Sequence, residues 1–199
     1  MSSRPPKSRI IDTQFLLMAY CHGYFPMADA KNGEIGWYSP DPRGIFDLDH
    51  FKIPRSLRQT IRKNIFEVRV NNRFEEVIRS CGAREETWIS EDIVQTYVQL
   101  HRQGYAHSVE SWKNGVLVGG LYGVAIGGAF FGESMFSREG DASKVALVFL
   151  VERLNERGFE LLDTQWITGH LTRFGAKEIP RKEYLRILRR AIEKKGTFV

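Results

Sequence analysis

The sequence predicts an α+β fold, in which helices pack on the faces of a mixed β-sheet. Three segments with strand character follow one another, at residues 106–112, 116–126 and 129–135, and helical segments precede and follow them. Asn-Gly at 114–115 and Gly-Gly at 127–128 separate the three segments, as is typical of tight turns between antiparallel strands. The 199 residues include 13 Phe, 7 Tyr and 4 Trp, enough large apolar side chains for a packed core.

The N-terminal part, residues 1–48, is expected to form a small domain. Asp12 is a suitable N-cap for a helix over 13–20, which Gly23 and Pro26 then end. The stretch 28–42 is rich in Gly and Pro and is expected to be mainly loop. We therefore place a domain boundary near residue 48, with a larger domain over 49–199.

In the larger domain, helices are expected both before and after the three consecutive strands along the chain. Before those strands we expect a helix over 54–63, a strand over 66–70, a helix over 73–81 and a helix between Ser90 and Gly104. After them we expect a helix from Asp141 to Arg157, a buried strand over 159–163, a short helix ending at Phe174 and a basic terminal helix.

The net charge of +5 is unevenly distributed. Residues 51–73 and 171–199 carry +6 each, so the rest of the chain carries −7. Both basic segments have apolar residues at helical spacing and basic residues on the other face. Two such helices in an otherwise acidic chain favour a polyanionic partner such as nucleic acid, although a solvated basic face is the alternative for either one.

Several classes of protein are disfavoured. No apolar run approaches the roughly 20 residues of a membrane span, and Met1–Lys7 lacks the apolar stretch of a signal peptide. Cys21 and Cys81 lie far apart, which suits a reducing compartment. The five histidines form no pair at metal-ligand spacing. We therefore expect a cytoplasmic protein that does not associate with membranes and has no metal site.

Common catalytic motifs also fail. Residues 132–136, Gly-Glu-Ser-Met-Phe, match a nucleophile elbow for four positions but lack its second Gly, so a hydrogen-bonding or packing role is favoured for Ser134. Neither Gly119-Gly120 nor Gly127-Gly128 has the spaced glycines that hold a pyrophosphate on a helix N-terminus, and both are interpreted as hairpin turns.

Two strand ends carry candidate chemistry. Asp163 and Gln165 are two residues apart at the end of an apolar strand, so they point to the same side, where they can accept, orient or relay a proton. A strand-end cap explains the same spacing. Residues 130–136 combine bulky apolar side chains with Glu133, and ordinary core with an exposed Glu is the alternative interpretation.

A set of motifs occurs in one order along the chain. They are WYSPDPR at 37–43, ETWI at 86–89, HSVESW at 107–112, GGLYGV at 119–124, GESMFS at 132–137, ASK at 142–144 and LDTQ at 162–165. Together they closely resemble the bacterial leucyl/phenylalanyl-tRNA–protein transferases, over about residues 15–184. The resemblance implies a catalytic domain like the GCN5-related N-acyltransferases, preceded by a small N-terminal domain.

The implied activity moves Leu or Phe, with Met as a further candidate donor, from aminoacyl-tRNA to the α-amine of proteins that begin with Lys or Arg. The product would enter the N-degron pathway for degradation. An aminoacyl ester is already activated, so the resemblance implies no cofactor and no covalent nucleophile. We expect the protein to act as a monomer.

The resemblance also implies roles for individual residues. Asp163 matches the proposed base and Gln165 its hydrogen-bonded relay partner. The aminoacyl group would be bound by Leu121, Phe130, Glu133, Ser134, Met135, Leu147 and Leu162. Trp88 matches the residue that stacks on the terminal adenine, and Arg55, Arg58, Arg62 and Lys63 match a basic cluster that contacts the acceptor stem. Met27 departs from the pattern, because relatives can have a second Trp there.

An ordinary Asp has a pKa near 3.9 and is a poor base for an α-amine, whose pKa is about 7.7–8.0. Our hypothesis is that Asp163 holds the ammonium and that the proton leaves late, during attack. Two rival functions remain: an acetyl-CoA-dependent N-acetyltransferase, which should show a pyrophosphate loop that is absent here, and a non-catalytic tRNA-binding module, which leaves Asp163 and Gln165 unused.

Overall fold

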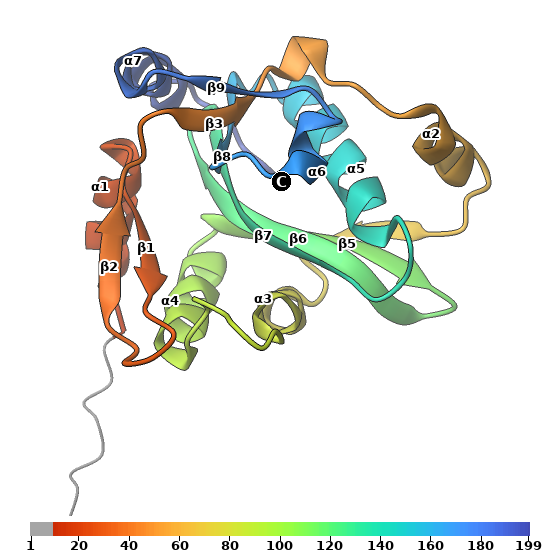
Figure 1. Ribbon diagram of the computed structural model, residues 1–199, viewed down its shortest axis with the longest axis horizontal. Coiled ribbons are helices and arrows are strands. Elements are labelled where there is room, and N and C mark those ends of the chain that lie inside the picture. The colour runs from red at the N-terminus through yellow and green to blue at the C-terminus, as the bar shows by residue number, and fades with distance from the viewer. Residues whose placement is uncertain (1–9) are drawn as a thin grey trace, which may run out of the picture.

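A computed structural model of the protein describes residues 10–199, so the prediction made on Met1–Lys7 lies outside the described residues. Its main feature is a seven-stranded mixed sheet in the order β4-β5-β6-β7-β8-β3-β9 (Figure 1). The strands are β3 (Arg43–Phe46), β4 (Glu67–Val70), β5 (Ala106–Lys113), β6 (Val116–Ile126), β7 (Ala129–Ser137), β8 (Leu161–Gln165) and β9 (Ala176–Ile179). Strands β7 and β8 pair in parallel, and the other neighbouring pairs are antiparallel.

Helices cover both faces of this sheet, as Figure 1 shows. On one face, one apolar core joins the sheet to α1 (Thr13–Cys21), α3 (Phe74–Gly82), α4 (Glu91–Arg102) and α7 (Arg181–Ile192). On the other face, a second core forms around α2 (Arg55–Arg62) and α5 (Ala142–Glu156), with the short helix α6 (Gly169–Thr172) nearby. The observed layers therefore confirm the predicted mixed α+β fold with flanking helices.

Most of the predicted helices and strands are present within two residues of their expected limits. Asp12 caps α1 by accepting a hydrogen bond from the Phe15 N–H, and Ser90 caps α4 through the Ile93 N–H. Asp141 precedes α5 but does not cap it through its side chain, because its carboxylate instead binds Lys144 and Thr60.

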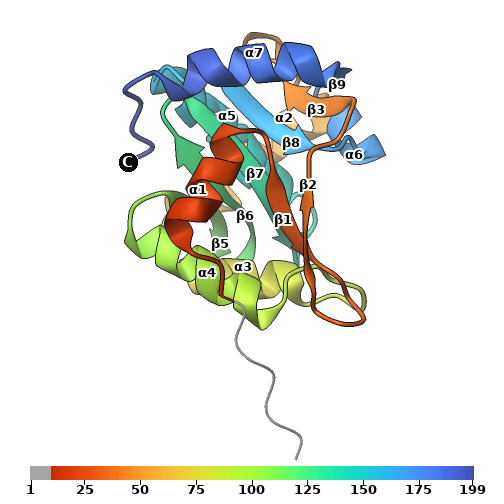
Figure 2. The ribbon, with the colours of Figure 1, turned by 90° about the vertical axis from the view of Figure 1, so that its left-hand side faces the viewer.

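The segment expected to be loop contains short strands. Strands β1 (Phe25–Ala28) and β2 (Ile35–Tyr38) form a separate antiparallel pair beside α1 (Figure 2). Strands β3 and β9 were also missed. Each has only four residues, and each is defined by pairing with residues far away in the chain, which local sequence patterns do not report.

The expected boundary near residue 48 stays a prediction. Strand β3 lies on its N-terminal side and yet hydrogen-bonds to β8 and β9 within the large sheet. The interpretation of Gly119-Gly120 as a turn is wrong, because both glycines lie inside β6. A side chain at Gly119 would collide with Ala142 at the start of α5, so this glycine permits close packing between helix and strand.

Candidate active site

Strand β8 brings Asp163 against Arg43 of β3, its neighbour in the sheet. Both side chains are completely buried. The Arg43 guanidinium donates two parallel hydrogen bonds, from Nε to Oδ1 at 2.9 Å and from Nη2 to Oδ2 at 2.6 Å. Its Nη1 donates to the Gly23 carbonyl at 3.0 Å, which ties the N-terminal segment to the sheet.

Two further donors occupy the Asp163 carboxylate. The Tyr184 hydroxyl, from α7, donates to Oδ2 at 2.8 Å, and the Gln165 N–H donates to Oδ1 at 2.9 Å. Burial and the adjacent Asp163 raise the pKa of Tyr184 well above its ordinary value, so the hydroxyl keeps its proton. The Asp163 oxygens are therefore committed to protein donors, and the carboxylate does not line the cavity described below.

Gln165 adopts a left-handed backbone conformation, with φ of +57°. The hydrogen bond from its N–H to Asp163 holds this turn at the end of β8. Its side-chain Nε2 lies 3.4 Å from Glu133 Oε1. Asp163 thus fixes the backbone at Gln165, and Gln165 in turn faces Glu133.

Glu133, on β7, is enclosed by tyrosines from two helices. Tyr20 of α1 donates to Oε1 at 2.7 Å and Tyr97 of α4 donates to Oε2 at 3.3 Å, and the two hydroxyls also bond to each other. Burial raises the pKa of Glu133 to about 7, although the Tyr20 hydrogen bond acts in the opposite direction. Near pH 7 this carboxyl is present in both protonation states.

Glu133 and Gln165 line a cavity of about 250 Å³, whose other lining residues come from β1, the segment before α4, the large sheet, α5 and the α6 segment. Most of the remaining lining is apolar or aromatic, and Glu133 is the one carboxylate among the lining residues within 10–199. The cavity brings together these residues from the sequence-based prediction: Trp88, Leu121, Glu133, Ser134, Met135, Leu147, Leu162 and Gln165. Phe130 does not line it and packs in the core below, 5.1 Å from the Phe198 ring.

Sequence reasoning missed several residues of this site. Arg43 is the last residue of a quoted motif, but nothing in the local pattern indicated that it is buried against Asp163. Trp166 directly follows Gln165, lines the cavity and is 44% exposed. Its ring makes edge contacts with Phe25 and Tyr38, and Met27 lines the same cavity. The signal available in the sequence was a Trp directly after the predicted Asp163–Gln165 pair.

The predicted tRNA-binding residues of α2 do not line this cavity. Arg55, Arg58, Arg62 and Lys63 are exposed to solvent. Helix α2 contacts the start of α5, where the Thr60 hydroxyl lies 3.2 Å from Asp141 Oδ2. The basic helix α2 and the cavity are therefore separate, and both contact α5: α2 at the start of the helix, and the cavity at Leu147 and Leu150.

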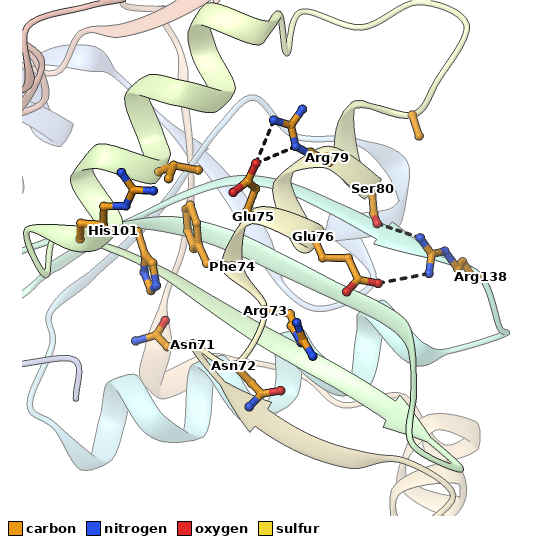
Figure 3. A pocket seen from close by; sticks show the side chains of 13 residues that line it. Asn71, Asn72, Arg73, Phe74, Glu75, Glu76, Arg79, Ser80, His101 and Arg138 are labelled. Carbon is orange, nitrogen blue, oxygen red and sulfur yellow. Dashed lines mark hydrogen bonds and ion pairs between the residues drawn. The ribbon is translucent and has the colours of Figure 1, made fainter.

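A larger hollow of about 680 Å³ lies over α3 and the end of α4 (Figure 3). Two ion pairs link charged side chains of its lining, Arg79 with Glu75 and Arg138 with Glu76. No lining residue belongs to the Asp163 or Glu133 network. The smaller apolar cavity is thus the better candidate for chemistry.

Two structural features are absent from residues 10–199. No group of three His, Cys, Asp or Glu side chains is positioned to hold a metal ion. No helix is long and apolar enough to cross a membrane.

Comparison with known proteins identifies the family. The family model for leucyl/phenylalanyl-tRNA protein transferase matches residues 45–189, and the model for the N-terminal domain of the same proteins matches residues 9–41. The chain belongs to the leucyl/phenylalanyl-tRNA–protein transferase family. The N-terminal match ends at residue 41 and the larger match begins at residue 45, so the division between them falls at the start of β3 (Arg43–Phe46).

Individual relatives of this transferase family agree. A leucyl/phenylalanyl-tRNA–protein transferase from Gloeobacter violaceus is 55% identical over 90% of this chain and 93% of its own length. One from Herpetosiphon aurantiacus is 52% identical over 94% and 98%. A solved structure, L-PGS from Bacillus licheniformis, aligns with a TM-score of 0.43 at 16% identity over 80% of this chain and 55% of that one.

Proposed function

We propose that this protein transfers Leu or Phe from aminoacyl-tRNA to the α-amine of proteins that begin with Lys or Arg. The products would be marked for N-degron degradation in the cytoplasm, and the protein would act as a monomer. The observation that carries the proposal is the apolar cavity in which Glu133, with a pKa of about 7, is the one carboxylate among the described lining residues. The mixed sheet with its parallel β7–β8 pair supports a fold like that of the GCN5-related acyltransferases.

The cavity suits one side chain and its ester. Its volume of about 250 Å³ lies below the roughly 300–1,000 Å³ of pockets for drug-sized ligands. Leu121, Leu147 and Leu162 provide an apolar wall without donors, which accepts Leu and Phe alike because these two share only bulk and apolar surface. Leu121 stands where relatives can have Met, a substitution of similar volume that preserves this preference.

The reaction needs positioning and the removal of one proton. The acceptor amine attacks the ester carbonyl, a C–N bond forms, the C–O bond to the ribose breaks, and the ribose hydroxyl leaves with a proton. Holding the amine and the ester in attack geometry contributes up to ~7–11 kcal/mol. An α-amine of pKa about 7.7–8.0 must first lose a proton. The pKa of Glu133, about 7, is close to that of the amine, so its carboxylate is suited to accept the proton.

Gln165 and Asp163 then have different roles. The Gln165 amide borders the cavity beside Glu133 and orients the reacting groups. Asp163 is buried against Arg43 and Tyr184, which does not favour our hypothesis that it holds the substrate ammonium itself. It acts in this proposal as a positioning residue, through the backbone of Gln165.

Aromatic side chains at the cavity wall support a site for the terminal adenine of the tRNA. Trp88 lines the cavity, and stacking of a base on its ring would contribute ~1–3 kcal/mol. Met27 and Trp166 line the same cavity. We propose that these two side chains together replace the second Trp that relatives can place at the Met27 position.

A donor and acceptor panel tests the proposal. Labelled Phe-tRNA or labelled acetyl-CoA is offered with a peptide that begins with Lys or with the same peptide beginning with Ala. Transfer from Phe-tRNA to the Lys peptide alone is the expected result. Acetyl transfer would instead indicate an N-acetyltransferase, and tRNA binding without any transfer would indicate a non-catalytic RNA-binding protein.

A further inference from the structure

The cavity of about 250 Å³ that Glu133 and Gln165 line is called the acyl cavity below. Another cavity, of about 470 Å³ and called the second cavity, adjoins it at Met135 and takes no part in the chemistry above. It lies between the end of α3, the end of β7, the start of α5 and the helix α6. Its lining includes no Asp or Glu among the described residues, and its polar members are Ser80, Arg84, Ser137, Arg138, Ser143 and His170. Two arginines and three hydroxyls facing one hollow form a surface suited to an anion.

Arg84 joins the two cavities. Its Nη2 donates to the Met135 carbonyl and lies 3.5 Å from the Ser134 hydroxyl, and both of these residues line the acyl cavity. The Arg84 side chain is otherwise exposed, so its remaining N–H groups are available to a ligand in the second cavity.

Arg138 stands on the opposite side of the hollow. It is held by hydrogen bonds to the Ser80 hydroxyl at 2.9 Å and the Leu117 carbonyl at 3.0 Å, and it lies over the Phe136 ring. Figure 3 shows Arg138 directed toward Ser80 and Glu76. The Glu76 contact is long, at 3.9 Å, and about half of each side chain is exposed, so this pair neutralises the guanidinium only weakly.

The second cavity reaches the start of α5, the part of that helix that α2 contacts. His170 of α6 lines it, while Thr168 and Leu171 of the same segment line the acyl cavity. Burial, with Lys144 and Arg173 nearby, lowers the pKa of His170, so it is a neutral hydrogen-bonding group above pH 7. At the start of α5, Asp141 is paired with Lys144 and bound by Thr60 of α2.

We propose that this second cavity binds the phosphodiester groups of the unpaired 3′ nucleotides that precede the terminal adenosine of the tRNA. The inference rests on the proposed function. If the aminoacyl ester occupies the acyl cavity, the preceding nucleotides must leave along an adjoining surface. The second cavity offers the guanidinium groups of Arg84 and Arg138 and the hydroxyls of Ser80 and Ser143, and none of its described lining residues is a carboxylate.

A cycle of protein and RNA changes tests the subsite. Uncharged tRNA is prepared with a native CCA end or with neutral methylphosphonate linkages between its last nucleotides, and its Kd is measured by fluorescence anisotropy. Arg84→Gln and Arg138→Gln are each expected to weaken binding of the native RNA about tenfold and binding of the neutral RNA less than twofold. The slope of log K against log salt should fall by about 0.7 for each variant with native RNA.

Arg79→Gln is the matched control, since Arg79 is an exposed arginine on α3 that does not line the second cavity. It should change neither affinity by more than twofold. Equal weakening of both RNAs by Arg84→Gln, or no weakening of either, would overturn the subsite. If the variants do not fold, the comparison is made with the wild-type protein alone. Its Kd for the RNA with neutral linkages should then be at least fivefold higher than its Kd for the native RNA.

The two proposals fail separately. If Phe is transferred from tRNA but the arginine variants weaken native and neutral RNA equally, the subsite is wrong and the proposed function stands. If the arginine variants weaken only the native RNA but no Phe is transferred, the RNA subsite stands and the proposed function is wrong.

Discussion

Glu133 and Asp163 are neighbouring carboxylates with opposite surroundings. Asp163 meets a guanidinium, a hydroxyl and a backbone N–H, which together compensate a buried negative charge. Glu133 meets two tyrosine hydroxyls and an amide, none of which carries a positive charge. Asp163 is thereby suited to a structural role, and Glu133 to exchanging a proton near neutral pH.

Gln mimics a protonated Glu that cannot titrate. Replacing Glu133 by Gln should therefore remove the contribution of Glu133 to the pH dependence of the free energy of unfolding. A raised folded-state pKa stabilises the protein below pH 4.5, and this contribution is lost as pH rises through about 7. The shift from 4.5 to about 7 corresponds to about 3 kcal/mol. The free energy of unfolding of the wild type, relative to Glu133→Gln, should therefore fall by about that amount between pH 4.5 and 8 in urea titrations. Parallel pH dependences of the two proteins would contradict the assignment.

Replacing Arg43 by Gln should leave the Asp163 charge buried without its partner. We expect the free energy of unfolding to fall by about 3–5 kcal/mol, measured by urea denaturation at pH 7. Tyr184→Phe serves as the comparison, because it removes one hydrogen bond to the same carboxylate and should cost about 1.5–3 kcal/mol. An Arg43→Gln loss below 1 kcal/mol would mean that the pair does not stabilise the fold.

The proximity of Asp163 and Gln165 was predictable at this scale, but their surroundings were not. Asp163 and Gln165 stand two residues apart at a strand end, so a local pattern and a family resemblance both identify them. Arg43 is separated from Asp163 by 120 residues, and Tyr20 from Glu133 by 113. No local periodicity reports such pairings, which only the packing of the sheet and α1 creates.

At the level of elements, the approach of α5 to β6 depends on a glycine. A Cβ built at Gly119 would lie 2.5 Å from the Ala142 Cβ and 3.0 Å from backbone atoms of α5. The helix begins at this point, and Ser143 and Lys144 lie beside the second cavity and the α2 contact. Close packing here therefore positions the basic surface relative to the acyl cavity.

Gly119→Ala is expected to destabilise the protein by about 1–3 kcal/mol, because the added methyl group overpacks the contact between helix and strand. Gly140→Ala is the control, since a Cβ there meets nothing within 4 Å, and we expect a change within about 0.5 kcal/mol. Thermal unfolding of both variants checks the prediction. Equal unfolding midpoints for the two would show that α5 shifts without cost.

At the scale of the whole molecule, the two basic segments occupy different regions. Figure 1 shows α2 and α7 on opposite sides of the fold. Helix α2 contacts the start of α5, next to the second cavity, whereas α7 packs Tyr184, Leu188 and Ala191 against the sheet and α1. A single nucleic acid that enters the acyl cavity through the second cavity therefore meets α2 rather than α7.

The salt dependence of tRNA binding separates the two helices. The double variant Arg62→Gln with Lys63→Gln should weaken tRNA binding and lower the slope of log K against log salt by about 2. Lys182→Gln with Arg189→Gln on α7 removes the same charge and should change the slope by less than about 0.5 if α7 makes no phosphate contact. Equal effects of both double variants would indicate binding by net charge rather than by the α2 surface.

The sequence by itself determined the long helices, the three central strands and the family, and it indicated eight of the residues that line the acyl cavity. These follow from periodicity, caps and ordered motifs, which are properties of neighbouring residues. Only the tertiary structure decided that β3 enters the large sheet, that Arg43 neutralises Asp163 and that tyrosines enclose Glu133. Burial and charge pairing between distant segments set the protonation of a site, and neither exists until the chain has folded.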